Sequence, residues 1–128
     1  EQLGIQHPKD SNIKGCDIVT FYGEATHPEA KYRNVHVFAD GQIDRSPGGT
    51  GTSAMLAYFL AKNEISIEDV TISEGPAGGL FEGRIANSWE ENGISYITPD
   101  ISSVAYLTGI HNFYLDARDP MINGFAKK

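Results

Sequence analysis

Residues 44–54, with the sequence DRSPGGTGTSA, join a loop of proline and glycine to the start of an apolar helical segment. Glycine allows the backbone to approach a ligand closely and to adopt positive φ angles. The first N–H groups of a helix have no acceptor within the helix, so such a loop can direct several of them at one anion. We therefore expect the amides of Gly49, Thr50 and Gly51 to bind a small anionic group. An ordinary capped helix start is the alternative that the spacing alone leaves open.

The helix that would present these amides is predicted at residues 52–63. Residues 54–61 are almost entirely apolar, so we expect sheet to cover this helix on most sides. Thr50, Thr52 or Ser53 can supply a side chain that caps its N-terminus.

The rest of the chain predicts short strands, after a helical tail in residues 1–6. Runs rich in β-branched and aromatic residues indicate strands at residues 16–22, 32–38, 69–74, 80–86, 94–97, 101–107 and 110–116. Asp40-Gly41 predicts a hairpin turn, and Pro99-Asp100 predicts a turn between two strands. The predicted fold class is α+β, with a curved, barrel-like, mainly antiparallel sheet wrapped around one buried central helix.

Composition argues against several kinds of protein. The 128 residues suit a single domain, and a net charge of −7 is unfavourable for binding nucleic acid. No apolar run approaches the length of a membrane span. Cys16 is the only cysteine, which excludes an internal disulfide and favours a cytoplasmic location. The four histidines lack the spacing of a zinc site, so we expect no metal.

The run from Asp44 to Ala54 resembles the signature of the proline racemase family, which usually reads DRSPCGTGTSA. This family includes hydroxyproline epimerases and hydroxyproline dehydratases. Other segments that resemble the family follow in the right order, namely Thr26-His27-Pro28-Glu29 with Arg33-Asn34-Val35, residues 72–84, Leu107-Thr108-Gly109, and Asp119-Pro120 with Gly124-Phe125. The resemblance covers the whole chain as the C-terminal half of a two-lobed enzyme. It implies one half of a diaminopimelate-epimerase-like fold, with the catalytic site between the halves.

The resemblance also implies the chemistry and the site residues. Proton transfer at Cα of proline or hydroxyproline, without a cofactor, needs a base, an acid and stabilisation of the carboxylate as it becomes enediolate-like. Gly49 and Thr50 are then expected to bind the carboxylate, Asp44 the substrate ammonium, and Phe38 to line the ring pocket. A turn-initiating Asp44 and a core Phe38 are the structural alternatives. We expect Arg45 to fasten the loop by pairing with a carboxylate.

Gly48 stands where racemases of this family hold a catalytic cysteine. Glycine cannot transfer a proton, so racemisation would lack its second thiol. Dehydratases that act on trans-3-hydroxyproline also lack this cysteine and need only one base. A non-catalytic anion-binding domain, or pseudoenzyme, is the alternative from another class. Cys16 is not expected to replace the thiol, because free cysteines are most often buried and inert.

These features together predict the partners. The chain begins with Glu1 rather than Met, and its first residues read like the end of an element begun earlier, so we expect a piece of a longer protein. The other catalytic residue would lie on the N-terminal half of the same enzyme. The isolated lobe is expected to expose apolar residues and to self-associate, with a homodimer as one possibility. We expect neither a nucleic acid nor a membrane as partner.

Overall fold

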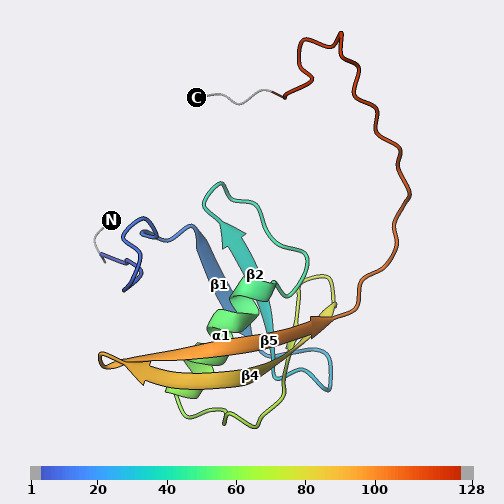
Figure 1. Cartoon of the computed structure of the whole chain (residues 1–128). Coiled ribbons are helices and arrows are strands. Elements are labelled where there is room, and N and C mark those ends of the chain that lie inside the picture. Colours follow the sequence, from blue (N-terminus) through green and yellow to red (C-terminus); the bar gives the residue numbers. More distant parts are fainter. Residues whose placement is uncertain (1–3, 125–128) are drawn as a thin grey trace.

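The computed structural model describes residues 4–124, which form five strands and one helix (Figure 1). In chain order these are β1 Ile18–Gly23, β2 Tyr32–Phe38, α1 Gly49–Ala61, β3 Thr71–Glu74, β4 Leu80–Glu91 and β5 Ile94–Ser103. The predicted boundaries of β2 are confirmed, and the predicted turn at Asp40-Gly41 is present, since the Phe38 N–H donates to the Gln42 carbonyl at 2.9 Å. No helix among these residues is long and apolar enough to cross a membrane.

The five strands form one mixed sheet in the order β1-β2-β3-β4-β5. Neighbouring strands are antiparallel except β2 and β3, which are parallel and are connected through α1. The sheet curls around the helix as a half-barrel (Figure 1). The predicted α+β fold with a curved, mainly antiparallel sheet around one helix is therefore confirmed. Because α1 connects two parallel strands, its N-terminus lies beyond the C-terminal end of β2.

One face of α1 builds the hydrophobic core. Thr52, Met55, Leu56 and Phe59 are buried, and their spacing places them on one side of the helix. The buried apolar residues that surround this face are Tyr32, Ile65 and Ile85, with Leu60, Ile97 and Ile101 partly buried beside them.

The opposite face of α1 is open. Ala54, Ala57 and Ala61 are exposed, and Tyr58 keeps 40% of its surface accessible. The prediction that sheet covers the helix on most sides is wrong, because the half-barrel of described strands leaves this face of the helix uncovered. An apolar helix face without cover is a surface suited to further protein contacts.

Two other predicted elements differ from the structure. The described part of the predicted N-terminal helical tail is not helical, and Gln6 pairs with Lys14 in an isolated β-bridge. Pro99-Asp100 does not form a turn but lies within β5, which joins the predicted strand at residues 94–97 to the first part of the one predicted at residues 101–107 and ends at Ser103. Proline is tolerated there because β5 is an edge strand.

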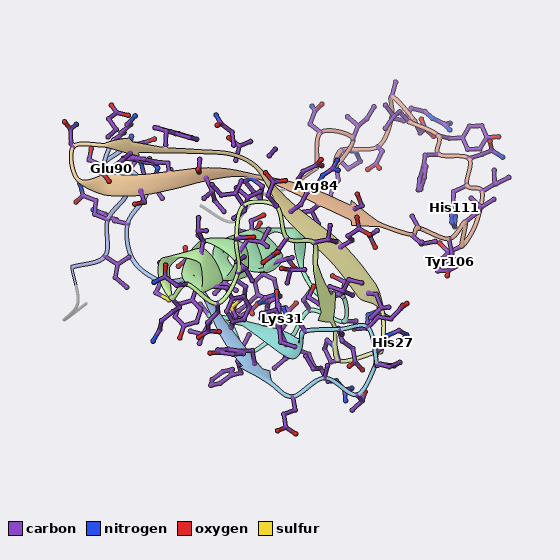
Figure 2. All side chains as sticks on the ribbon, turned by 90° about the horizontal axis from the view of Figure 1, so that it is seen from below. His27, Lys31, Arg84, Glu90, Tyr106 and His111 are labelled. Carbon is purple, nitrogen blue, oxygen red and sulfur yellow. The ribbon has the colours of Figure 1, made fainter. Side chains whose placement is uncertain are left out.

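Residues 104–124, here called the C-terminal arm, lead away from the sheet as an extended segment that ends in turns after residue 116 (Figure 1). The predicted strand at residues 110–116 is absent, because no described segment pairs with it. Figure 2 shows Tyr106 and His111 on this arm, apart from the curled sheet. Apolar residues of the arm keep 72–90% of their surface exposed, namely Val104, Tyr106, Leu107, Ile110, Phe113, Tyr114 and Leu115.

Glu74, at the end of β3, joins the sheet to the loop that contains His27. Its buried carboxylate accepts hydrogen bonds from the Thr26 hydroxyl at 2.5 Å, the Thr26 N–H at 2.7 Å and the His27 N–H at 3.0 Å. The Thr26 hydroxyl, the two N–H groups and the nearby Arg33 lower the pKa of Glu74 from its ordinary 4.5 to about 2. The folded state therefore favours the ionised form of Glu74, and the ionised carboxylate in turn stabilises the fold.

We predict that Glu74→Gln lowers the melting temperature of the chain at about pH 7, because an amide cannot accept all three hydrogen bonds. The folded-state pKa is depressed, so the stabilisation is present above pH 4.5 and is lost as the pH falls towards 2. The difference between wild type and Glu74→Gln should shrink over that interval in thermal melts. Glu82→Gln removes an exposed carboxylate of β4 and serves as control. A constant difference across the interval would contradict the role of Glu74.

Candidate anion-binding site

The loop between β2 and α1 presents the first amides of the helix to solvent. Gly48 is the N-cap with a φ of 72°, and its carbonyl accepts the Thr52 N–H at 2.9 Å. No side chain in the described part of the chain caps the helix, so the expected cap by Thr50, Thr52 or Ser53 is wrong. Within residues 4–124, the N–H groups of Gly49, Thr50 and Gly51 have no hydrogen-bond acceptor, and Gly49 and Thr50 are exposed. These N–H groups can donate hydrogen bonds to a small anion such as a carboxylate.

Asp44 shapes this loop through one of its two carboxylate oxygens. Oδ1 accepts from both the N–H and the hydroxyl of Ser46 at 2.9 Å, and Ser46 Oγ accepts the Gly48 N–H at 3.1 Å. Asp44 therefore does initiate a turn. No described residue donates a hydrogen bond to Oδ2, which leaves this oxygen available to a cationic group. Asp44 can therefore initiate the turn through Oδ1 and still offer Oδ2 to a substrate ammonium.

Phe38 and Arg45 lie beside the loop. Phe38 ends β2 on the same face as His36, two residues further on, and its ring is partly exposed. Its expected place in a ring pocket stays a prediction. Arg45 is exposed, and no described carboxylate lies within 4 Å of it, so the expected ion pair that fastens the loop is wrong.

Two residues of β2 fasten the loop instead. His36 Nε2 lies 2.6 Å from the Pro47 carbonyl oxygen, and Asn34 Nδ2 donates to the same oxygen at 3.0 Å. From the sequence, His36 was weighed only as a zinc ligand, and this contact was not predicted. The signal was available, because strand alternation places Asn34 and His36 together on one face of β2, opposite Val35 and Val37.

Neither Cys16 nor a metal-binding cluster contributes to this loop in the described part of the chain. Cys16 is exposed rather than buried as expected, and it precedes β1 rather than opening a helix. Its Sγ contacts the Ile18 carbonyl oxygen at 3.4 Å. Among residues 4–124, no three His, Cys, Asp or Glu side chains gather as they would around a metal ion.

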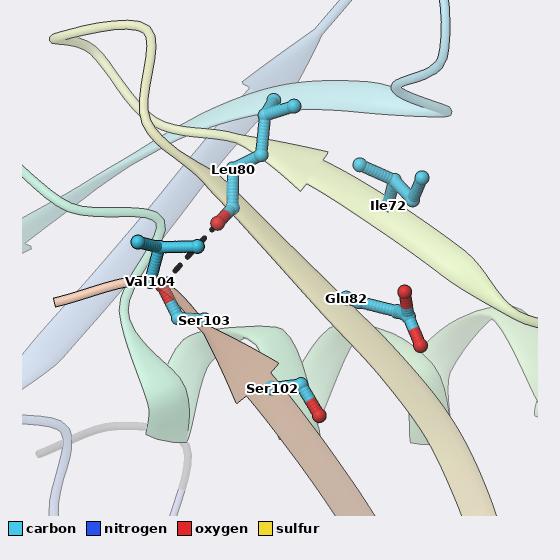
Figure 3. Close-up of a pocket in the computed structure, with 6 residues that line it drawn as sticks. All are labelled: Ile72, Leu80, Glu82, Ser102, Ser103 and Val104. Atoms are coloured by element: carbon cyan, nitrogen blue, oxygen red, sulfur yellow. Dashed lines mark hydrogen bonds between the residues drawn. The ribbon is translucent and has the colours of Figure 1, made fainter.

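A shallow pocket of about 270 Å³ lies elsewhere, over β3, β4 and β5 (Figure 3). Its lining residues are Ile72, Leu80, Glu82, Ser102, Ser103 and Val104. Ile72 and Glu82 alternate with the buried Ser73 and Gly83, so the pocket lies on the face of the sheet that points away from α1. None of the expected site residues contributes to it.

Comparisons with known proteins agree with the loop sequence. The family model described as "Proline racemase" matches residues 1–126. The chain is 44% identical to the proline racemase of Clostridioides difficile, with 100% of this chain and 38% of that protein covered. It is 36% identical to the trans-3-hydroxy-L-proline dehydratase of Bacillus cereus, with 97% of this chain and 37% of that protein covered.

A solved structure supports the same relationship. The fold superposes with a TM-score of 0.77 on a hydroxyproline epimerase from Agrobacterium vitis, with bound trans-4-hydroxy-L-proline, at 32% identity. That superposition covers 98% of this chain and 36% of the epimerase. The chain thus spans less than two-fifths of the length of the relatives that it matches.

Gly75 holds the loop from the side of β3, and this contact is testable. A Cβ at Gly75 would lie 2.7 Å from the Pro47 nitrogen and from the Ser46 carbonyl carbon, both backbone atoms. We predict that Gly75→Ala destabilises the chain by about 1–3 kcal/mol in denaturant unfolding, because the loop must move. Gly79→Ala is the matched control in the same hairpin, since its Cβ would meet Pro47 at an ordinary 3.9 Å. Equal unfolding midpoints for the two variants would refute the contact.

Proposed function

The chain belongs to the proline racemase family, and from that membership we propose that it forms one lobe of an enzyme that removes the Cα proton of proline or hydroxyproline without a cofactor. The observation that carries this proposal is the set of unpartnered amides at Gly49, Thr50 and Gly51, presented by the family's signature loop. Carboxylate binding is the step that a racemase, an epimerase and a dehydratase of this family have in common.

In this proposal the loop binds the substrate carboxylate and stabilises it as negative charge develops. Backbone donors need no reorganisation when the proton leaves, and one such donor contributes about 3–4 kcal/mol in comparable sites. The Thr50 hydroxyl can add a further donor. Asp44 Oδ2 faces no described donor and would accept the ring ammonium, while Phe38 would contact the apolar part of the ring.

We propose that the proton-abstracting thiol lies on a second lobe, with this chain as the C-terminal half. The relatives are more than twice as long as this chain, which supports a missing lobe. The open face of α1 and the exposed apolar residues of the C-terminal arm offer surfaces that such a lobe can cover. The single cysteine and the composition support a cytoplasmic enzyme.

Dehydration of trans-3-hydroxyproline is a second candidate, and Gly48 favours it. Racemisation of proline requires a proton carrier on each side of Cα, whereas Gly48 offers no side chain on this lobe. In dehydration, one base removes the Cα proton and the electron pair forms the C=C bond as the C–O bond to the 3-hydroxyl breaks. The same group can return its proton to the leaving oxygen, which departs as water, so one proton carrier suffices. The similarity to the Bacillus cereus protein named trans-3-hydroxy-L-proline dehydratase supports this second candidate.

The proposal predicts how full-length protein treats substrates in D₂O. With one proton carrier, one enantiomer of proline should gain deuterium at Cα and keep its configuration, because no group protonates the other face. Trans-3-hydroxyproline should lose water under the same conditions. Proton NMR and chiral chromatography measure both. Absence of Cα deuteration with proline, 4-hydroxyproline and trans-3-hydroxyproline would overturn the enzymatic proposal.

Calorimetry with pyrrole-2-carboxylate, a planar mimic of the deprotonated substrate, identifies the non-catalytic alternative. Tight binding without any Cα exchange by the full-length protein would indicate a pseudoenzyme that retains only the anion site.

The missing lobe leads to a prediction about self-association. We expect the 128-residue chain to form dimers or larger species through its exposed apolar surfaces, and light scattering should report a mass above the monomer. Leu107→Ser combined with Phe113→Ser should shift the mass towards the monomer, because both residues lie exposed on the arm. Ile67→Ser, at an exposed position outside the arm, should not change it. A monomeric wild-type chain at high concentration would exclude this surface as an interface.

A further inference from the structure

His36 is a buried imidazole directly beneath the anion-binding loop. Only 2% of its surface is accessible. Nε2 lies 2.6 Å from the Pro47 carbonyl oxygen, which can only accept, so Nε2 carries a hydrogen. Nδ1 lies 2.8 Å from Thr20 Oγ1, whose hydroxyl can donate to it. Both ring nitrogens therefore have partners from two separate elements, and the ring is held in place.

The same ring lies against two glycines of the loop. A Cβ at Gly48 would lie 2.3 Å from His36 Cδ2, and a Cβ at Gly51 would lie 1.9 Å from His36 Cε1. Real Cβ contacts essentially never fall below 3.0 Å. Because the ring is anchored by strand β2 and by both hydrogen bonds, it cannot simply swing aside. The imidazole therefore occupies the space that a side chain at position 48 needs.

We propose that His36 is a positioning residue that also determines the reaction class of this site. By filling the space next to Gly48, it excludes the second thiol that two-base racemisation requires. By holding the Pro47 carbonyl, it fixes the direction of the Gly49 and Thr50 amides. The catalytic consequence rests on the proposed function, whereas the packing of His36 against the loop does not depend on it.

A double-mutant cycle tests the packing in the 128-residue chain, in a Cys16→Ser background that removes the other thiol. Gly48→Cys should sharply lower the denaturation midpoint when His36 is present. In combination with His36→Val the same change should cost far less, because the smaller side chain frees space and releases Pro47, so that the loop can leave its φ of 72°. Gly49→Cys is the matched control, since a Cβ there meets nothing within 4 Å. Equal effects of Gly48→Cys in the two backgrounds would overturn the inference.

The affinity for a carboxylate shows whether His36 positions the loop or only fills space beneath it. In full-length protein, His36→Val should weaken binding of pyrrole-2-carboxylate by about tenfold, because the Pro47 carbonyl loses a buried donor and the amides lose their fixed direction. His36→Gln keeps an N–H near the position of Nε2 and should recover most of the affinity. Unchanged affinity in His36→Val would show that the ring does not position the amides.

Turnover tests the reaction class. Full-length protein with Gly48→Cys alone should not invert L-proline, whereas Gly48→Cys with His36→Val should gain inversion. Inversion by the single variant would overturn the role of His36. If the stability cycle shows the expected coupling but no variant exchanges the Cα proton of any substrate, His36 packs as inferred and the proposed function fails instead.

Discussion

The Pro47 carbonyl oxygen is the acceptor on which the geometry of this lobe depends. It receives His36 Nε2 at 2.6 Å and Asn34 Nδ2 at 3.0 Å from β2, and the Thr52 hydroxyl at 3.3 Å from α1. Because the following peptide is planar and trans, the Gly48 N–H must point away from that oxygen, and it meets Ser46 Oγ there. Once this peptide is fixed, the next amides are directed outward at the start of the helix. The direction of these amides is thus set by buried polar contacts rather than by a side-chain cap.

The parallel pairing of β2 and β3 brings Glu74 and Gly75 to the end of the sheet where the loop before β2 and the loop before α1 both lie. α1 returns the chain so that Arg33 of β2 pairs with Glu74 of β3. Glu74 then holds Thr26 and His27 on one side, while Gly75 lies against the Ser46-Pro47 backbone on the other. A short parallel pair therefore positions the loop and the segment that precedes β2 at once. This explains why small residues and buried acceptors, rather than apolar packing, dominate this end of the molecule.

The elements that could be predicted from the sequence are those governed by local pattern. Alternation and β-branched residues define β2, and the signature followed by apolar residues defines the loop and α1. The errors concern tertiary partners. Pro99 is a typical turn former, but an edge strand tolerates it. Residues 110–116 have the composition of a strand, but no strand within residues 4–124 pairs with them. Strand alternation places His36 beside Asn34 on one face of β2, but it does not tell which loop that face meets. The importance of His36 follows from three-dimensional proximity to Gly48 and Gly51, which no sequence period encodes.

Glycine at position 48 changes the electrostatics of the loop as well as its proton transfer. A cysteine at a helix N-terminus tends to ionise, because the helix dipole stabilises the thiolate. Such a thiolate would compete with a substrate carboxylate for the same partial positive charge. With glycine there, and with the Pro47 carbonyl already engaged by His36, no thiolate at position 48 would compete with an anion for the field of the first helical turn. In the proposed function, this lobe would hold the substrate carboxylate while a single base on a second lobe moves the proton, so that carboxylate recognition and proton transfer would be divided between the two lobes.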